Sequence, residues 1–487
     1  MRMFLAALMA VTMMLTGCSQ QQQKAEAAAP VKQSAKYVFF FIGDGMGLPQ
    51  RAATAAFLGR DLHIDKMPAQ GITTTYANDR FITGSAASAT ALASGQKTNI
   101  NYIGVDPNLK AVKTVAEIAK EQGKKVGIVS SVSIDHATPA AFYAHVKTRK
   151  MYHEIDHALA NSGFDFFGGG GMVDPMGKKS KKPLGDALEQ ARTNGYKIID
   201  NKAAFMALKP GDGKVLAWNS WLQDAQAMPY AMDMTDKDIT LPEFTAKAIE
   251  MLDNDKGFFL MVEGGKIDWA CHANDAAASL KNTIAFDDSV KVALDFYSKH
   301  PKETLIVVTG DHECGGLTVG FAGTVYDSNF NMLNGQKVSF QKLSDEIMKN
   351  FKAKNGSFED MKPLITEYFG FKFEGDPKTD KQVLQPFEVD MIRAAFERSM
   401  AGETEGSNNQ ETYLLYGGYE PLAVTLTHVL NNKAGLGWTS YSHTGVPVST
   451  SAVGVASEVF NGSYDNTDIG LKIMAVLGEQ PKVQHVN

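Results

Sequence analysis

The sequence predicts an α/β fold, specifically an α/β/α sandwich with a mostly parallel central sheet. Two observations carry this prediction. Short apolar runs typical of buried strands alternate along the chain with segments whose apolar residues recur at the period of a helix. Four of the apolar runs also lead into turns that carry an acidic residue, and in open α/β sheets ligands bind at the carboxyl ends of the strands.

The composition is that of a soluble globular protein with a large core. The chain has 487 residues, of which 44% are hydrophobic and 21% are charged. Its formal net charge of −6 is small for this length and lacks the basic excess of a nucleic-acid-binding protein. We therefore expect no nucleic-acid-binding surface.

Residues 1–17 have the features of a secretory signal peptide, with one arginine and an apolar run too short to span a bilayer comfortably. The ending Leu-Thr-Gly-Cys resembles the lipobox of bacterial lipoproteins, which implies a lipid on Cys18. Ser19 as the next residue implies sorting to the outer membrane. An ordinary signal peptide cut nearby is the alternative. With residues 18–35 as a disordered tether, we expect an exported lipoprotein that faces the periplasm or the cell surface.

Five apolar runs are predicted strands, at residues 37–45, 124–133, 164–171, 257–265 and 304–312. The segments 108–124 and 241–252 between them have helical spacing. Acids and histidines follow four of the strands: Asp44, Asp135 with His136, Glu263, and Asp311 with His312. A solvated loop explains one acid at a strand end but explains four poorly. We expect these side chains to converge on one crevice.

Residues 322–436 interrupt the alternation. They contain amphipathic helical patterns joined by polar connectors, which predicts a mainly helical insertion. The stretch that begins at Pro421 indicates a return to the sheet. The predicted catalytic domain therefore consists of residues 36–321 and 437–482.

Several polar residues have the spacing of a catalytic or metal site. Ser85 lies where small residues run into an alanine-rich helix, and a helix N-terminus favours an anion. Asp268 and His272 are four apart and share a helix face, while carboxylate and imidazole donors suit zinc. Further candidates are Asp311, His312 and His443 as ligands, with His136, Thr138 and Arg149 in one segment. The planar fork of Arg149 matches two phosphate oxygens.

Together these motifs resemble the alkaline phosphatase family. The matching pieces are IGDGMG, TGSAASATALASG, DHATPAAFYAHV with the later arginine, EGGKIDWACH, DHECGG and SHTG. They occur in the family's order and cover residues 36 to 320 and 436 to 460, with the helical insertion outside the resemblance. The family implies hydrolysis of phosphate monoesters at an alkaline pH optimum, through a phosphoserine intermediate.

The resemblance also implies a role for each position. Ser85 resembles the nucleophile, and Arg149 resembles the residue that grips the phosphate. The other positions resemble ligands of three metals: Asp44, Asp311 and His312 for a zinc that activates the serine, Asp268, His272 and His443 for a second zinc, and Asp44, Thr138 and Glu263 for a third metal, usually magnesium. Two zinc ions roughly 4 Å apart would clamp the attacking and leaving oxygens. A homodimer is also expected from the resemblance.

Three positions depart from the usual family pattern. Gly84 stands where an aspartate usually precedes the nucleophile and helps to hold the arginine, so phosphate binding is expected to be weaker. His136 stands where some members have aspartate, and Trp269 where some have lysine. Both lie near the third metal or the phosphate, and an imidazole there could turn that site towards zinc.

Three other functions compete with this interpretation. His153 and His157 form an H-E-x-x-H pattern typical of zinc proteases, but the glycine and third histidine of the longer motif are missing, so we expect a structural or solvent-facing role on a surface helix. A phosphodiesterase or sulfatase of the same superfamily is the nearer alternative, although no sulfatase motif is intact. A non-catalytic lipoprotein with structural metals is the last. Cys271 and Cys314 remain open as metal ligands, a disulfide or buried small residues.

Overall fold

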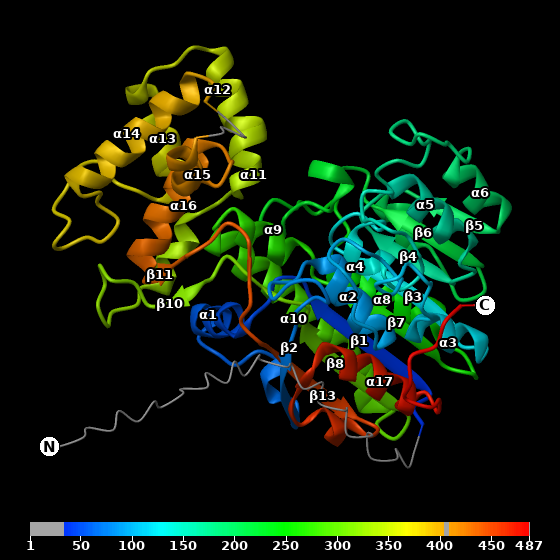
Figure 1. The fold of residues 1–487 in the computed structure, drawn as a ribbon. Coiled ribbons are helices and arrows are strands. Elements are labelled where there is room, and N and C mark those ends of the chain that lie inside the picture. Colours follow the sequence, from blue (N-terminus) through cyan, green and yellow to red (C-terminus); the bar gives the residue numbers. More distant parts are fainter. Residues whose placement is uncertain (1–33, 404–408, 487) are drawn as a thin grey trace, which may run out of the picture.

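The computed structural model describes residues 34–403 and 409–486 (Figure 1). The predicted signal peptide, Cys18 and nearly all of the predicted tether lie outside these ranges. Within the described ranges, no helix combines the length and the apolar character needed to cross a membrane.

A ten-stranded sheet forms the centre of the molecule. In spatial order its strands are β14 (Gly462–Asp465), β2 (Ala69–Thr74), β13 (Val448–Gly454), β8 (Thr304–Gly310), β1 (Tyr37–Gly43), β7 (Phe258–Glu263), β3 (Lys125–Ser130), β4 (Phe166–Gly169), β6 (Lys214–Trp218) and β5 (Tyr196–Ile199). Only β13 runs against its neighbours, pairing antiparallel with both β2 and β8. The other neighbours pair in parallel, so the predicted mostly parallel sheet is confirmed.

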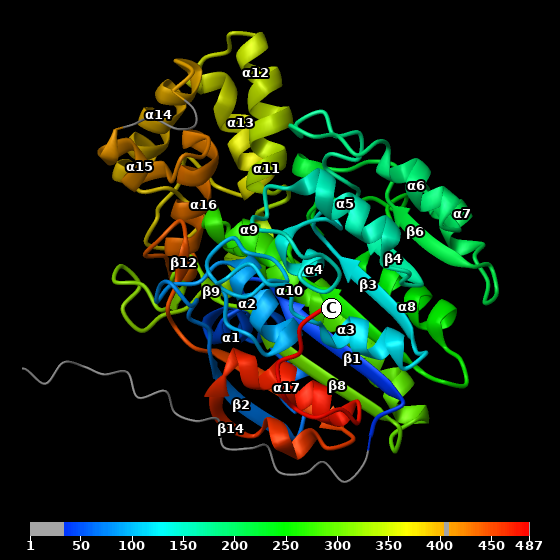
Figure 2. The same ribbon diagram turned by 45° about the vertical axis from the view of Figure 1, so that its right-hand side comes forward.

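Helices cover both faces of this sheet (Figure 2). Along β1, Val38, Phe40 and Ile42 point into one core, which is closed by α2 (Ser85–Ser94), α3 (Val115–Glu121), α5 (Tyr152–Asn161) and α17 (Asn466–Val476). Phe39 and Phe41 point into the other core, with α1 (Leu48–Leu58), α8 (Leu241–Leu252) and α10 (Ala276–Lys299). The alternation follows from the two-residue period of a strand that is buried on both faces. This arrangement is the predicted α/β/α sandwich.

All five predicted strands are present in the central sheet, but four of its other strands were not predicted: β2, β5, β6 and β14. The edge strand β14 is exposed or half-buried throughout, and β2 alternates buried and exposed residues. Neither contains a continuous apolar run, which is the pattern that identifies the central strands. Short or half-buried strands therefore leave a weak signal in a sequence of this kind.

The described parts of residues 330–403 and 409–434 are mainly helical and lie to one side of the sheet in both views (Figures 1 and 2). The longer helices are α13 (Phe358–Phe369), α14 (Pro386–Met400), α15 (Gln410–Tyr416) and α16 (Pro421–Ala434). A short antiparallel pair, β10 (Thr318–Val319) with β11 (Leu436–Gly437), joins the two ends of this segment. Side chains of the helical segment pack with the start of α10 in a third core.

The predicted return to the sheet at Pro421 is wrong for its first half, which is α16. Pro421 occupies the first turn, where its missing N–H costs no hydrogen bond. The Glu420 carboxylate accepts a hydrogen bond from the Ala423 amide at 2.7 Å and caps the helix. The sheet resumes only at β13.

Candidate active site

Four neighbouring strands bring their carboxyl ends to one edge of the sheet, in the order β8, β1, β7, β3. Asp311 follows β8 directly, Asp44 follows β1 and Glu263 ends β7. All three are fully buried. The fourth predicted acid, Asp135, instead accepts a hydrogen bond from the Val173 amide at 2.6 Å. The segment after β3 therefore reaches the cluster through residues that follow Asp135.

Ser85 is the first residue of α2, as predicted, and Gly84 is its N-cap. Ser85 Oγ lies 3.3 Å from His312 Nε2, and the side chain is 1% exposed. The same His312 nitrogen lies 3.3 Å from Asp44 Oδ1 and 3.2 Å from Asp311 Oδ2. The structure thus places this hydroxyl at the N-terminus of a buried helix, beside an imidazole nitrogen that two carboxylates also approach.

A second group forms beside the first. Asp268 and His272 lie one turn apart on α9 (Lys266–His272), with Asp268 Oδ2 3.3 Å from His272 Nε2. His443, on the short strand β12 (His443–Thr444), brings its Nε2 to 3.1 Å from His272 Nε2 and 3.5 Å from Asp268 Oδ1. The His443 ring stacks on the ring of His312 with centroids 3.6 Å apart, so the two groups adjoin.

Main-chain carbonyls fix the tautomers of both histidines in this second group. His272 Nδ1 donates to the Tyr441 carbonyl at 2.7 Å, and His443 Nδ1 donates to the Thr83 carbonyl at 2.9 Å. A carbonyl only accepts, so each Nδ1 carries a proton and each ring turns its Nε2 towards Asp268 and the other imidazole. Metal-binding histidines are typically oriented in this way by a second partner.

A third group contains Asp44 again. Thr138 Oγ1 donates to Asp44 Oδ2 at 3.3 Å, and His136 Nδ1 lies 4.0 Å from Glu263 Oε1. Arg149 Nη2 donates to His136 Nε2 at 2.6 Å. The Trp269 and His136 rings meet edge to face, with their centroids 5.8 Å apart. His136 is therefore held between Arg149, Trp269 and Glu263.

Burial and mutual repulsion shift the ionisation of these carboxyl groups. Burial, followed by the charges of neighbouring acids, raises the pKa of Asp44 and of Asp311 well above the ordinary range. Burial raises the pKa of Glu263 to about 7. Such a concentration of buried acids is costly unless positive charge neutralises it.

Asp268 shows the opposite shift. Burial favours a higher pKa, but the charges of His272 and His443 outweigh it and hold the pKa of Asp268 well below its usual value. Burial likewise acts to lower the pKa of His272, but Asp268 outweighs it and raises that pKa to about 9. A bound cation would take the place of the proton that His272 otherwise holds.

The donors present fit divalent metals. Within the described residues, four buried carboxylate oxygens of the site have no hydrogen-bond partner: Asp44 Oδ1, Glu263 Oε1, Asp268 Oδ1 and Asp311 Oδ2. Three sets of residues can each offer donor atoms that lie within 4.8 Å of one another inside the set. The sets are Asp44, Asp268 and His312, then Asp268, His272, Cys314 and His443, and finally Asp44, His136 and Glu263. Carboxylate oxygens with imidazole nitrogens suit zinc, and an oxygen-rich set suits magnesium.

The cysteines are separate thiols. Both Cys271 and Cys314 are free and buried, so the disulfide is not formed. Cys314 is the only one of the two that belongs to a set of potential metal donors in the described chain.

Glu313 is a supporting residue that sequence reasoning did not identify. Its carboxylate accepts hydrogen bonds from Gln50 Nε2 at 2.8 Å, from the Leu317 amide at 3.2 Å and from Thr444 Oγ1. These bonds tie β9 (Glu313–Cys314), next to His312, to the strand that carries His443. Its partners are distant in the chain, so no spacing in the sequence points to it.

The H-E-x-x-H histidines lie outside the candidate site. His153 is 1% exposed, accepts a hydrogen bond from the Leu184 amide at 2.7 Å and contacts the Asp174 carbonyl at 3.0 Å through its other nitrogen. His157 contacts the Gly185 carbonyl at 3.3 Å. The expected structural role fits these bonds, but the two rings face a loop rather than solvent.

Replacing His153 with alanine should leave kcat and KM for any reaction at the candidate site unchanged. It should lower the free energy of unfolding by about 1–3 kcal/mol, because the buried Asp174 carbonyl and the partly buried Leu184 amide lose their partner. Steady-state kinetics and urea unfolding of the same preparation measure both quantities. A loss of turnover with unchanged stability would contradict the structural role and revive the protease hypothesis.

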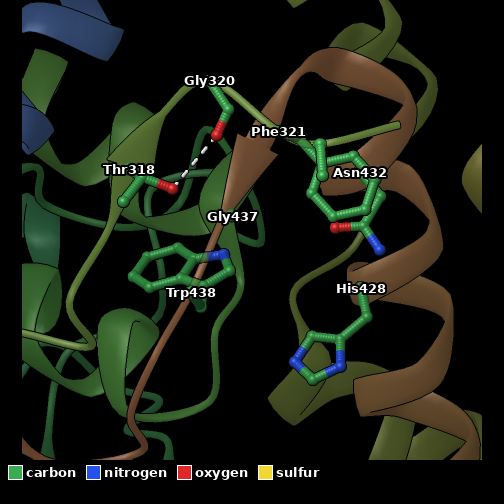
Figure 3. Close-up of a pocket in the computed structure, with 8 residues that line it drawn as sticks. Thr318, Gly320, Phe321, His428, Asn432, Gly437 and Trp438 are labelled. Carbon is green, nitrogen blue, oxygen red and sulfur yellow. Dashed lines mark hydrogen bonds between the residues drawn. The ribbon is translucent and has the colours of Figure 1, made fainter. Parts of the chain in front are cut away.

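A cavity of about 360 Å³ lies between α16 and the short β10–β11 pair (Figure 3). Its walls come from β10, β11, α16 and adjoining residues: Thr318, Gly320, Phe321, Ala322, His428, Asn432, Gly437 and Trp438. None of the predicted site residues lines it. The metal-donor cluster is thus distinct from this cavity.

Comparison with known proteins gives one family. The family model described as alkaline phosphatase matches residues 35–479. Alkaline phosphatase 4 of Bacillus subtilis (strain 168) is 32% identical over 474 residues, which cover 94% of this chain and 92% of that protein. The match runs through residues 322–436, so the expectation that the helical segment lies outside the resemblance is wrong.

Solved structures agree with the sequence comparison. The cold-active alkaline phosphatase of a psychrophilic Shewanella sp. is 29% identical with a TM-score of 0.74, covering 91% of this chain and 99% of that one. The alkaline phosphatase of the Antarctic bacterium TAB5 is 27% identical with a TM-score of 0.64, covering 92% and 99%. The fold, family and enzyme class expected from the motifs are confirmed, and the chain belongs to the alkaline phosphatase family.

Proposed function

We propose that Ser85 is the nucleophile of this phosphomonoesterase. The contact that carries the proposal is the 3.3 Å approach of Ser85 Oγ to His312 Nε2 at the N-terminus of α2. Ser85 Oγ would attack phosphorus, forming the Oγ–P bond as the bond to the ester oxygen breaks and the alcohol leaves with a proton. Water would then attack the phosphoserine, releasing inorganic phosphate and restoring the hydroxyl.

Arg149 and the α2 N-terminus would bind the phosphate oxygens. The free N–H groups of the first turn favour an anion, and the guanidinium offers two parallel donors. In the structure Arg149 donates to His136 Nε2, which orients one side of its fork. His136 and Trp269 would therefore position Arg149 as well as border the third metal.

We assign two zinc ions and one magnesium ion to this cluster of donors. Asp44, Asp311 and His312 would hold the metal beside Ser85, and Asp268, His272 and His443 the second. When bound, these metals supply the positive charge that ionises the serine and stabilises the leaving oxygen. Asp44, Thr138 and Glu263 would hold the magnesium, and the nearby His136 would allow zinc to replace it. A variant of the TAB5 enzyme with one histidine changed to glutamate has magnesium bound in its M3 site.

We further propose that the chain is an exported lipoprotein anchored through Cys18 and associates as a homodimer. The lipobox-like ending of the signal segment supports the anchor. Mass spectrometry of the N-terminal peptide from membrane fractions would detect the lipid on Cys18. An unmodified N-terminus beyond Cys18 would contradict the anchor.

One set of assays tests the function. Hydrolysis of a chromogenic phosphate monoester, a diester, a sulfate ester and casein is measured before and after chelation with EDTA. We expect turnover of the monoester, lost on chelation and restored by zinc with magnesium. Preferred turnover of the diester or sulfate ester would assign the chain to another activity of the superfamily, and casein cleavage would favour a protease.

Replacing Gly84 with aspartate should strengthen phosphate binding. Gly84 has φ −130° and ψ 164°, which any residue adopts, and an added Cβ would meet only the Ile100 side chain at 3.5 Å. A carboxylate there would cap α2 and offer Arg149 an anionic partner. We expect a lower inhibition constant for inorganic phosphate. Gly84→Ser is the matched control, since it caps the helix without charge, and an equal change in both variants would exclude the effect on Arg149.

A further inference from the structure

Cys314 lies opposite a residue of the second metal group. The antiparallel pair of β9 and β12 places Cys314 directly across from His443. Directly opposed residues in such a pair project their side chains from the same face of the sheet. The Cys314 side chain is fully buried beside α9, where its Sγ contacts the Asp268 carbonyl at 3.7 Å.

Four potential donors converge at this point. One atom each from Asp268, His272, Cys314 and His443 lies within 4.8 Å of the other three. Asp268 is 3% exposed, and its Oδ1 has no hydrogen-bond partner among the described residues. The two imidazoles face each other through their Nε2 atoms at 3.1 Å. A cation between the four donors would give Asp268 Oδ1 the partner that it lacks.

We infer that the Cys314 thiolate is a fourth protein ligand of the metal held by Asp268, His272 and His443. The inference rests on the proposed function, which assigns a zinc to those three residues. On binding, the metal–sulfur bond would form and the thiol proton would pass to solvent, so no oxidant or reductant is needed. One thiolate, one carboxylate and two imidazoles make a donor set that suits zinc and softer cations and excludes magnesium.

A Cys314 thiolate would change the net charge of the metal and its ligands. With Asp268 alone, a divalent cation at the site keeps one net positive charge. With the Cys314 thiolate as well, the charge is balanced within a buried site, where unbalanced charge is costly. The metal would bind more tightly and act as a weaker Lewis acid than in a set of oxygen and nitrogen donors alone.

Cys271 provides a matched control within the same chain. It is also fully buried, and it precedes His272 on α9. Its Sγ contacts Ser279 Oγ at 3.3 Å and Gln50 Nε2 at 3.7 Å, and it belongs to none of the donor sets. Cys271 is next to a proposed ligand in the sequence, but its thiol is outside the donor cluster. Comparing the two variants therefore distinguishes metal binding by Cys314 from a general effect of replacing a buried cysteine.

The test is the absorption spectrum of the full chain after its metals are replaced by Co²⁺. A cobalt–thiolate bond produces a charge-transfer band in the near ultraviolet in addition to the visible bands of the ion. We expect that band in the wild type and in Cys271→Ser, and we expect it to be absent in Cys314→Ser. Cobalt bound per chain is measured on the same samples.

The outcomes distinguish the inference from the proposed function. Stoichiometric cobalt with visible bands but no thiolate band in the wild type would overturn the Cys314 ligand and leave the proposed metal centre standing. A band that survives in Cys314→Ser would also overturn it. Failure of the wild type to bind cobalt at all would overturn the proposed metal centre itself. Should Cys314→Ser not fold, ¹¹³Cd NMR of the wild type decides, because a shift in the nitrogen and oxygen range contradicts sulfur ligation.

Discussion

Replacing Ser85 with alanine is expected to lower phosphomonoester turnover by at least about 1,000-fold, because the group that forms the covalent intermediate is removed. The buried hydroxyl is small, and the start of α2 keeps its other contacts, so the fold should remain. Acid-quenched reactions with ³²P-labelled substrate should trap label on the wild type and none on the variant.

Ser94→Ala is the control for this experiment. Ser94 lies at the last position of the same helix, and its Oγ donates to the Thr90 carbonyl at 2.6 Å, away from the site. It should retain both turnover and label. Full turnover in Ser85→Ala would remove Ser85 as the nucleophile.

Replacing Asp44 with asparagine should have a comparable effect through the metals. Asp44 belongs to two of the three donor sets, with Oδ1 near His312 and Oδ2 bonded to Thr138. The change keeps the side chain's shape but removes its negative charge. We expect two metals per chain to be lost or weakened, and turnover to fall by more than the roughly 10- to 100-fold typical of an outer-shell partner. Metal analysis by plasma mass spectrometry counts the ions directly.

Asp238→Asn controls for the loss of a buried carboxylate. Asp238 is 4% exposed, and a single oxygen accepts bonds from the Thr235 amide and hydroxyl at 2.8 and 2.9 Å, so an amide oxygen can replace it. Metal content and activity should match the wild type. A full complement of three metals in Asp44→Asn would contradict the shared role of Asp44.

The parts of the fold that the sequence predicts are those with a strong local signal. β1, β7 and β8 are buried on both faces and so appear as uninterrupted apolar runs. β13 is also buried, but it contains serine and threonine whose hydroxyls bond across the sheet, as Thr450 does to Thr73 and Thr309. Satisfied buried polar groups give no apolar pattern, so neither the strand's limits nor its antiparallel direction follows from the sequence.

The candidate site divides in the same way. The positions of Asp44, Asp311 and Glu263 at strand ends predict their convergence, because parallel strands share an edge. Which donor pairs with which does not follow from spacing. The bond from Arg149 to His136 and the placement of Cys314 opposite His443 depend on loop paths and on a two-residue strand pair, which tertiary contacts determine.

The antiparallel strand β13 also has a consequence for the order of assembly during synthesis. It lies between β2 and β8, so β2, although synthesised early, cannot join the sheet until residues 448–454 have left the ribosome. His443 emerges immediately before them. The other candidate metal donors are therefore synthesised before the strand that closes the sheet. The donor group that contains His443 can therefore be completed only after nearly all of the chain has been synthesised.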